Sequence, residues 1–241
     1  MFFGLFWGDW TILVLIPAMI FAFYAQIKVK STFEKYAKVH NRRGITGADA
    51  ARRVLDAAGL YHVRIERIHG HLTDHYDPRE NVIRLSDATY ASTGIAAVGV
   101  AAHEAGHAVQ HAVGYVPIKV RAAIIPLTRF GSFLAMPLFI IGMLFGGGAQ
   151  IGSGIGDILM ITGILFFSFS TLFQLVTLPT EFNASSRAMR ALEDGGLLAA
   201  DELPAAKKTL SAAAMTYVAA LATSLASLLR LILIFNGNRR Q

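Results

Sequence analysis

Residues 103–107 read His-Glu-Ala-Gly-His and lie within a run of mostly small residues from Thr93 to Gly114. The spacing of the two histidines indicates a shared metal site only if the segment is helical. At about 3.6 residues per turn, His103 and His107 lie one turn apart on the same helical face, so both imidazoles can reach one Zn²⁺ ion. The stretch therefore predicts a helix that presents two metal ligands to one side.

The residues around this stretch favour a helix. Ser92 and Thr93 offer hydroxyl groups for its N-cap, and no proline occurs in residues 93–113. Gly114 is placed to adopt the left-handed conformation that often follows the last helical turn.

Glu104 follows the first histidine and would point beside the metal, where its carboxylate can accept a proton from a metal-bound water. The pattern is therefore typical of a zinc peptidase. The alternative interpretation is a buried amphipathic helix with two hydrogen-bonded histidines and no metal.

The composition indicates an integral membrane protein. Of 241 residues, 54% are hydrophobic and only 16% are charged, and the mean hydropathy is +0.49. Soluble domains rarely carry so few charges. The chain has no cysteine, which excludes a thiol mechanism and disulfide bonds.

Apolar segments long enough to cross a membrane occur four times, at 10–25, 122–146, 158–178 and 216–235. The first lacks a preceding basic region and is interpreted as an anchor rather than a signal peptide. A short glycine-rich link at 146–153 makes the second and third segments a hairpin. Arg129 and Arg230 lie within spans and are expected to snorkel or to face other helices.

The first long polar segment reads as a small α+β unit. Thr46 and Asp49 resemble a capping box for a helix that Gly59 would end. Residues 63–68 and 81–86 are predicted strands, and the turn-forming stretch between them contains Asp74 and Asp77 as expected turn caps. The strand at 81–86 is a candidate sheet edge for pairing with an extended substrate; the alternative is an ordinary strand that packs against the metal helix.

A catalytic zinc site typically has three protein ligands, and Glu181 is the best candidate for the third. It follows Pro179, which we expect to break the preceding helix, and two membrane crossings return it to the face of His103 and His107. His111 would lie about 12 Å from His103 along the helix axis, too far to share the ion. The remaining candidates, His69, His71 and His75, are expected to be solvated or to be outer partners of the site.

Four stretches together resemble the bacterial neutral zinc metallopeptidases of the membrane, called YugP-like: residues 72–78 (Leu-Thr-Asp-His-Tyr-Asp-Pro), 84–86 (Arg-Leu-Ser), 103–111 (His-Glu-Ala-Gly-His-Ala-Val-Gln-His) and 178–185 (Leu-Pro-Thr-Glu-Phe-Asn-Ala-Ser). The resemblance covers nearly the whole chain. It implies zinc ligands at His103, His107 and Glu181 and a catalytic base at Glu104. The chain is also similar to the HtpX-like and prenyl-protein peptidases, in which a Glu-x-x-Ala-Asp run supplies the third ligand; here Ser185 stands at the position of that Asp.

The expected fold is that of an integral membrane, predominantly α protein with about four transmembrane helices and a small zincin-like α+β domain carrying the His-Glu-x-x-His helix. Its segments are an N-terminal transmembrane helix (1–27), the α+β zinc-peptidase domain (28–121), a transmembrane hairpin (122–178), a polar segment with the third ligand (179–215), and a C-terminal transmembrane helix and tail (216–241).

The predicted function is that of a membrane-embedded, gluzincin-like zinc metalloendopeptidase with one Zn²⁺ per chain, acting on a peptide or a membrane protein. An oxyanion donor is also expected. Tyr217 and Arg187 are conceivable, although an interfacial tyrosine and a helix-surface arginine are the simpler interpretations. The alternative function is a zinc-binding membrane scaffold or adaptor without proteolytic activity. A transporter would need more polar residues inside its spans. The sequence assigns no oligomeric state.

The excess of Lys and Arg residues is better explained by membrane topology and anionic lipids than by binding to nucleic acid. Residues 28–121 and 179–215 hold 18 of the 22 Lys and Arg residues. This distribution predicts a multi-pass protein of the bacterial inner membrane whose zinc site faces the cytoplasm. A cysteine in place of Ser31 should then react with an impermeant thiol reagent only after cell lysis; labelling in intact cells would place the site outside.

Overall fold

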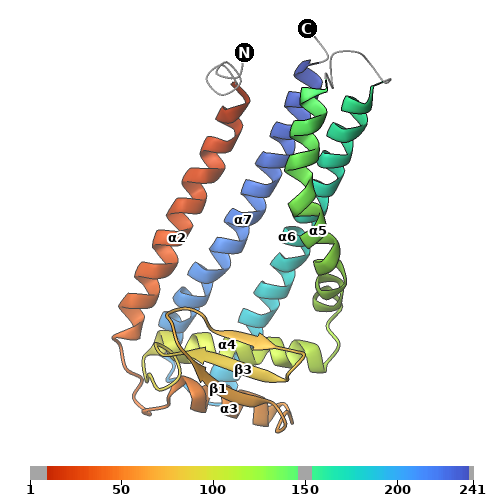
Figure 1. Ribbon diagram of the computed structural model, residues 1–241. Helices are drawn as coiled ribbons and strands as arrows, with labels where there is room; N and C mark the ends of the chain where they lie inside the picture. The colour runs from red at the N-terminus through yellow and green to blue at the C-terminus, as the bar shows by residue number, and fades with distance from the viewer. Residues whose placement is uncertain (1–9, 146–153, 239–241) are drawn as a thin grey trace. The chain divides into compact units, whose positions relative to one another are not determined.

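The computed structural model describes residues 10–145 and 154–238. The predicted link at 146–153 lies outside these residues. Figure 1 labels most of the elements. They follow one another as a 3₁₀ helix η1 (Trp10–Val14), then α2 (Leu15–Ala37), α3 (Gly47–Ala57), β1 (Arg64–Ile68), β2 (His75–Asp77), β3 (Val82–Ser86), α4 (Ile95–Ala112), α5 (Val116–Leu144), α6 (Ile155–Asp194) and α7 (Leu203–Asn238).

The chain divides into two compact units. The first, here the membrane unit, comprises Met1–Tyr24, Val120–Thr177 and Tyr217–Gln241. The second, here the polar unit, comprises Ala25–Lys119 and Leu178–Thr216. Each long helix therefore contributes an apolar part to the membrane unit and a more polar part to the polar unit.

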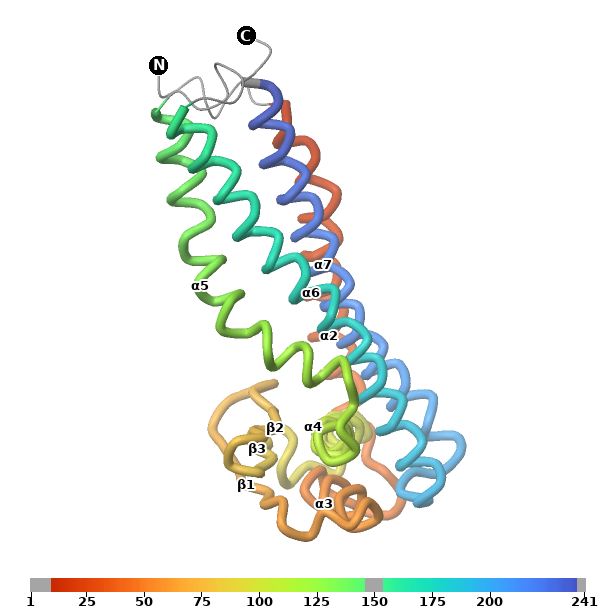
Figure 2. The backbone as a smooth tube through the Cα atoms, turned by 90° about the vertical axis from the view of Figure 1, so that its right-hand side faces the viewer, coloured from red at the N-terminus to blue at the C-terminus, as the bar shows by residue number. Residues whose placement is uncertain are grey.

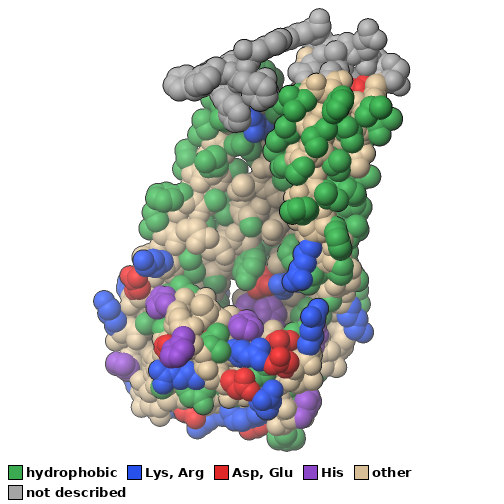
Figure 3. All heavy atoms as spheres, in the orientation of Figure 1, with side chains coloured by type: hydrophobic (Ala, Val, Ile, Leu, Met, Phe, Trp, Pro, Cys, Tyr) green, Lys and Arg blue, Asp and Glu red, His purple; other side chains and the backbone are tan. Residues whose placement is uncertain are grey.

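In the described part of the chain, the structure contains four helices that are long and apolar enough to cross a membrane: Trp10–Ala37, Val116–Leu144, Ile155–Asp194 and Leu203–Gly237. Only 11% to 22% of the most apolar window of each helix is buried inside the structure, so most of these side chains need lipid rather than water around them. Figure 3 shows hydrophobic side chains over these helices and most charged side chains over the polar unit. The predicted fold class is confirmed.

Close backbone contact joins the helices of the membrane unit. A Cβ atom at Gly163 of α6 would lie 2.7 Å from the carbonyl oxygen of Ala135 in α5, so only glycine permits this approach. The hydroxyl groups of Thr171 and Ser224 are 2.8 Å apart and join α6 to α7. Small residues and hydroxyl pairs are common at helix interfaces in membranes.

The expected break at Pro179 does not occur, because α6 continues through it to Asp194. A proline removes one backbone hydrogen bond and costs about 3 kcal/mol in a helix interior. The turns after it are fully buried at Ala184, Ala188 and Leu192, and this packing offsets the cost. The last long helix also begins earlier than predicted, at Leu203 rather than near residue 216.

The polar unit is built on a three-stranded sheet of order β1-β3-β2, with β1 parallel and β2 antiparallel to β3. Figure 2 looks along α4 and shows the sheet on one side of this helix and the ends of α6 and α7 on the other. The core between these layers consists of small and aliphatic side chains, among them Val54, Leu55, Ile83, Leu85, Val98, Ala102, Ala105, Leu192 and Leu210.

The prediction of an edge strand at 81–86 is wrong, because β3 is the central strand of the sheet. Its backbone pairs with β1 over Val82–Ser86 and with β2 at Val82, Ile83 and Arg84. The edges are β1 and β2, and β2 was not predicted because its three residues lie among turn formers. The edge strand β2 contacts α4.

Thr46, Asp49, Asp74 and Asp77 are the predicted caps of the polar unit, and three of them act as the sequence predicts. The capping box is confirmed: the Thr46 hydroxyl accepts a hydrogen bond from the Asp49 amide at 3.1 Å, and the Asp49 carboxylate accepts one from the Thr46 amide at 3.0 Å. The Thr46 hydroxyl also donates to the Asp49 carboxylate at 2.6 Å, and this bond, together with the one from the Thr46 amide, holds the pKa of Asp49 below its usual value. Asp77 also caps a turn, accepting from the Arg79 amide at 2.8 Å. Asp74 does not, because it binds the amide and hydroxyl of Ser86 at the end of β3.

The N-cap of α4 is Gly94, without a side-chain cap, rather than Ser92 or Thr93. A Cβ atom at Gly94 would lie 2.3 Å from the carbonyl oxygen of Ala37, so the end of α2 leaves space only for glycine. The Thr93 hydroxyl lies 2.7 Å from Nδ1 of His40 instead. At the other end, Gly114 has φ +65° and follows the last turn as expected.

Candidate metal centre

The three predicted ligands come together although His107 and Glu181 are 74 positions apart in the chain. His103 and His107 lie on α4, and Glu181 lies on the part of α6 that belongs to the polar unit. Oε2 of Glu181 is 3.3 Å from Nε2 of His103 and 3.5 Å from Nε2 of His107. The two rings are nearly perpendicular, with centroids 4.7 Å apart.

These separations fit a tetrahedral zinc ion. Zn–N and Zn–O bonds of about 2.0–2.1 Å place neighbouring ligand atoms about 3.3 Å apart in a tetrahedron. Within the described residues, one ligand atom from each side chain lies within 4.8 Å of the other two. Two imidazoles and one carboxylate are also a ligand set of known catalytic zinc sites. The residues present therefore fit the metal.

The site is shielded from solvent and electrostatically prepared for a cation. The side chain of Glu181 is 3% exposed, and those of His103 and His107 are 12% and 13% exposed. Burial alone lowers the pKa of His107, but Glu181, together with the charge of Glu104, raises it above its ordinary value. A site that favours positive charge on an imidazole also favours a bound metal cation.

Each histidine has a hydrogen-bond partner on its other ring nitrogen. Nδ1 of His103 lies 3.1 Å from the hydroxyl of Ser185, and Nδ1 of His107 lies 3.0 Å from Oε1 of Gln110. Ser185 therefore contacts His103 from the position where the Glu-x-x-Ala-Asp run described above has its aspartate. With both Nδ1 atoms engaged, both Nε2 atoms face Glu181.

Gly106 allows α4 and α6 to approach closely enough for three-way ligation. A Cβ atom at this position would lie 2.8 Å from the carbonyl oxygen of Ala184, closer than side-chain carbon atoms normally come to backbone. The spacing of the motif did not indicate this role of Gly106. A glycine between two ligands, with Ala184 and Ser185 after the third, was the available signal.

Gly106→Ala should therefore separate the two helices, cost about 1–3 kcal/mol of stability and weaken zinc binding. Gly99→Ala in the same helix is the matched control, because its Cβ atom would meet Ala206 at an ordinary 3.7 Å; it should keep zinc and gain up to about 1 kcal/mol. Zinc content and thermal unfolding of both variants are the measurements. Equal zinc content in the two would contradict this role of Gly106.

Glu104 lies on α4 beside the first ligand and is partly buried. Within residues 10–145 and 154–238, its carboxylate makes no hydrogen bond and no ion pair, and its charge acts on His107. Its position is the one expected for the proton acceptor of a peptidase.

The other polar candidates lie outside the three-residue cluster. The His111 ring packs against the Tyr76 ring of β2, with centroids 5.5 Å apart, and exposed His69 is 3.2 Å from Asp87. Arg187 donates from Nε to Oδ1 of Asn183 at 2.8 Å. Tyr217 belongs to the membrane unit.

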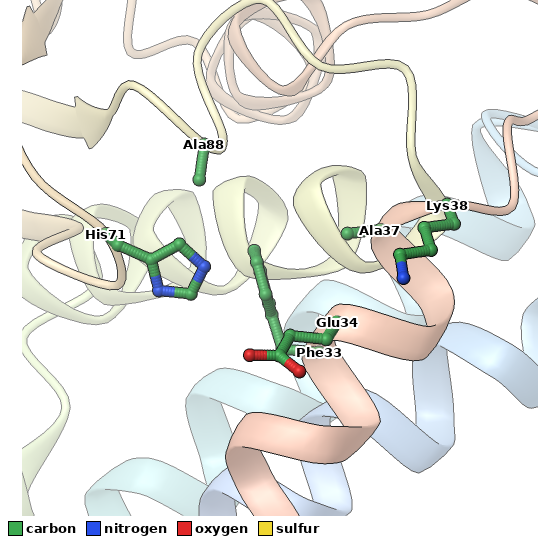
Figure 4. A pocket seen from close by; sticks show the side chains of 6 residues that line it. All are labelled: Phe33, Glu34, Ala37, Lys38, His71 and Ala88. Atoms are coloured by element: carbon green, nitrogen blue, oxygen red, sulfur yellow. The ribbon is translucent and has the colours of Figure 1, made fainter.

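The polar unit also contains a cavity of about 300 Å³ whose lining includes none of His103, His107 and Glu181. Figure 4 shows side chains that line it, among them Phe33 and Glu34 from α2, Lys38 directly after this helix, and His71 from the loop before β2. The rings of Phe33 and His71 meet edge to face, with centroids 5.3 Å apart. This cavity is distinct from the metal centre.

The chain is similar to a described protein family and to a named bacterial protein. A family described as "Putative neutral zinc metallopeptidase" matches residues 11–236. A Bacillus subtilis (strain 168) protein named "Putative membrane protease YugP" is 47% identical over 228 residues, covering 95% of this chain and 97% of that protein. No solved structure matches the chain. Because both matches extend over nearly the whole sequence, the resemblance is confirmed and the chain belongs to this family of neutral zinc metallopeptidases.

Proposed function

We propose that the protein is a zinc-dependent metalloendopeptidase of the membrane, with one zinc ion held by His103, His107 and Glu181 and with Glu104 as the general base. The observation that carries the proposal is the spacing of 3.3 and 3.5 Å between Glu181 Oε2 and the two imidazole nitrogens, with a carboxylate adjacent to the first histidine that has no other partner in the described residues.

When bound, zinc would acidify a water molecule and polarise the scissile carbonyl group. Glu104 would accept a proton from that water and return it to the leaving amine. Ser185 and Gln110 hold the two imidazoles with Nε2 toward Glu181, and the burial of Glu181 excludes water from the third ligand.

The substrate is proposed to be a peptide or a segment of a membrane protein, because the metal centre lies in a chain with four helices able to cross a bilayer. Hydrolysis of a peptide library by the detergent-purified protein tests the function, with Glu104→Gln as the inactive control. A wild-type protein that binds zinc and cleaves nothing in such a library would favour the scaffold interpretation instead. The cytoplasmic position of the site stays a prediction.

A further inference from the structure

Gln110 is fully buried, although it carries a polar amide. It lies on α4, one turn after His107. Its Oε1 atom is 3.0 Å from Nδ1 of His107, and its Nε2 atom donates to the carbonyl oxygen of Thr180 at 2.8 Å and to Oδ1 of Asn183 at 3.0 Å. Both ends of the amide are therefore used, as burial of a polar group requires.

The contact with Thr180 determines which way the amide points. A backbone carbonyl only accepts hydrogen bonds, so the atom of Gln110 that faces it must be the NH₂ group. The amide oxygen then faces His107, and an oxygen that only accepts requires a proton on Nδ1. Neutral His107 is thereby restricted to the tautomer whose Nε2 lone pair is free, and Nε2 is the atom that lies 3.5 Å from Glu181.

The same amide also holds the segment that carries the third ligand. Thr180 and Asn183 flank Glu181 on α6, so the NH₂ group of Gln110 binds α6 on both sides of the ligand. Asn183 Oδ1 is held in turn by Nε of Arg187 at 2.8 Å. One residue of α4 thus orients one ligand of its own helix and positions the backbone that presents another.

We propose that Gln110 is a positioning residue of the metal centre, which sets the tautomer of His107 and the distance between α4 and the Glu181 segment. The inference rests on the proposed function, because it assigns a purpose to the site only if the site holds zinc. Metal-binding histidines usually donate their second N–H to a carboxylate, a carbonyl or water. Here the partners of both Nδ1 atoms are neutral: the amide of Gln110 for His107 and the hydroxyl of Ser185 for His103.

The test is the zinc affinity of Gln110→Met, measured on the full-length protein in detergent by competition with a chromogenic chelator. Methionine has a similar volume but can neither accept from His107 nor donate to Thr180. Loss of an outer partner typically weakens metal binding by about 10- to 100-fold, and we expect a loss in that range. The absorption spectrum of the Co²⁺-loaded variant should also change, because the coordination geometry relaxes.

Val98→Ala is the matched control, since Val98 is fully buried in the same helix and its side chain has no group that can form a hydrogen bond. It should lower stability and leave the zinc affinity within about threefold of the wild type. The inference is overturned if Gln110→Met binds zinc within that same margin, or if Val98→Ala weakens zinc binding as much as Gln110→Met does.

Gln110→Glu serves if the methionine variant does not fold. It keeps an oxygen toward His107 and should retain more zinc affinity than Glu181→Ala; a loss as complete as that of Glu181→Ala would count against the inference. A wild-type protein that binds no zinc would overturn the proposed function as well, whereas normal zinc binding by both the wild type and Gln110→Met would overturn the inference alone.

Discussion

Glu104→Gln should retain zinc and lose peptide hydrolysis by a factor of about 10² or more, the usual contribution of a general base. The substitution keeps the size of the side chain and removes only its ability to accept a proton. Because the Glu104 carboxylate has no hydrogen bond or ion pair within the described residues, its replacement should disturb little else. The measurements are the zinc content of the purified variant and its initial rate on a cleaved library peptide.

Glu193→Gln is the control for this result. Glu193 lies exposed on α6, and its amide variant should cleave at the wild-type rate. Peptide turnover by Glu104→Gln at the wild-type rate would remove Glu104 from the role of base. A parallel loss of zinc and activity would instead show that Glu104 supports the metal rather than the proton transfer.

Glu181→Ala should reduce the zinc content sharply from the expected one ion per chain. With only two imidazoles left as protein ligands, water would have to fill the other two coordination positions of the zinc ion. The loss of zinc affinity should therefore exceed the loss of about 10- to 100-fold that follows removal of an outer partner. The measurement is the zinc content of the purified variant, by metal analysis after dialysis against a weak chelator. Glu193→Ala on the same helix provides the control.

Two outcomes distinguish the possible roles of Glu181. Zinc occupancy near that of the wild type would exclude Glu181 as a ligand and return the search to other carboxylates. Loss of zinc together with an unchanged thermal unfolding profile of the metal-free protein would assign Glu181 to the metal rather than to the packing of α4 against α6.

Local sequence determined those features whose causes lie within one or two turns. The helix around 103–107, the capping box of Thr46 and Asp49 and the glycine after α4 depend on neighbours a few residues away, and they were predicted from spacing alone. The apolar spans were equally readable, because a bilayer core demands about 20 apolar residues in a row. The three residues of the metal cluster were also named from motifs.

Tertiary structure decided what depends on distant partners. Central β3, the short β2, and the continuous α6 through Pro179 follow from pairing and burial that no local pattern contains. The orientation of Gln110 depends on a carbonyl group 70 residues away, and Gly94 and Gly106 are required by backbone from other helices. The sequence specifies which side chains are present, but long-range packing sets the distances between them. Because protein interiors are closely packed, there is room for only one arrangement.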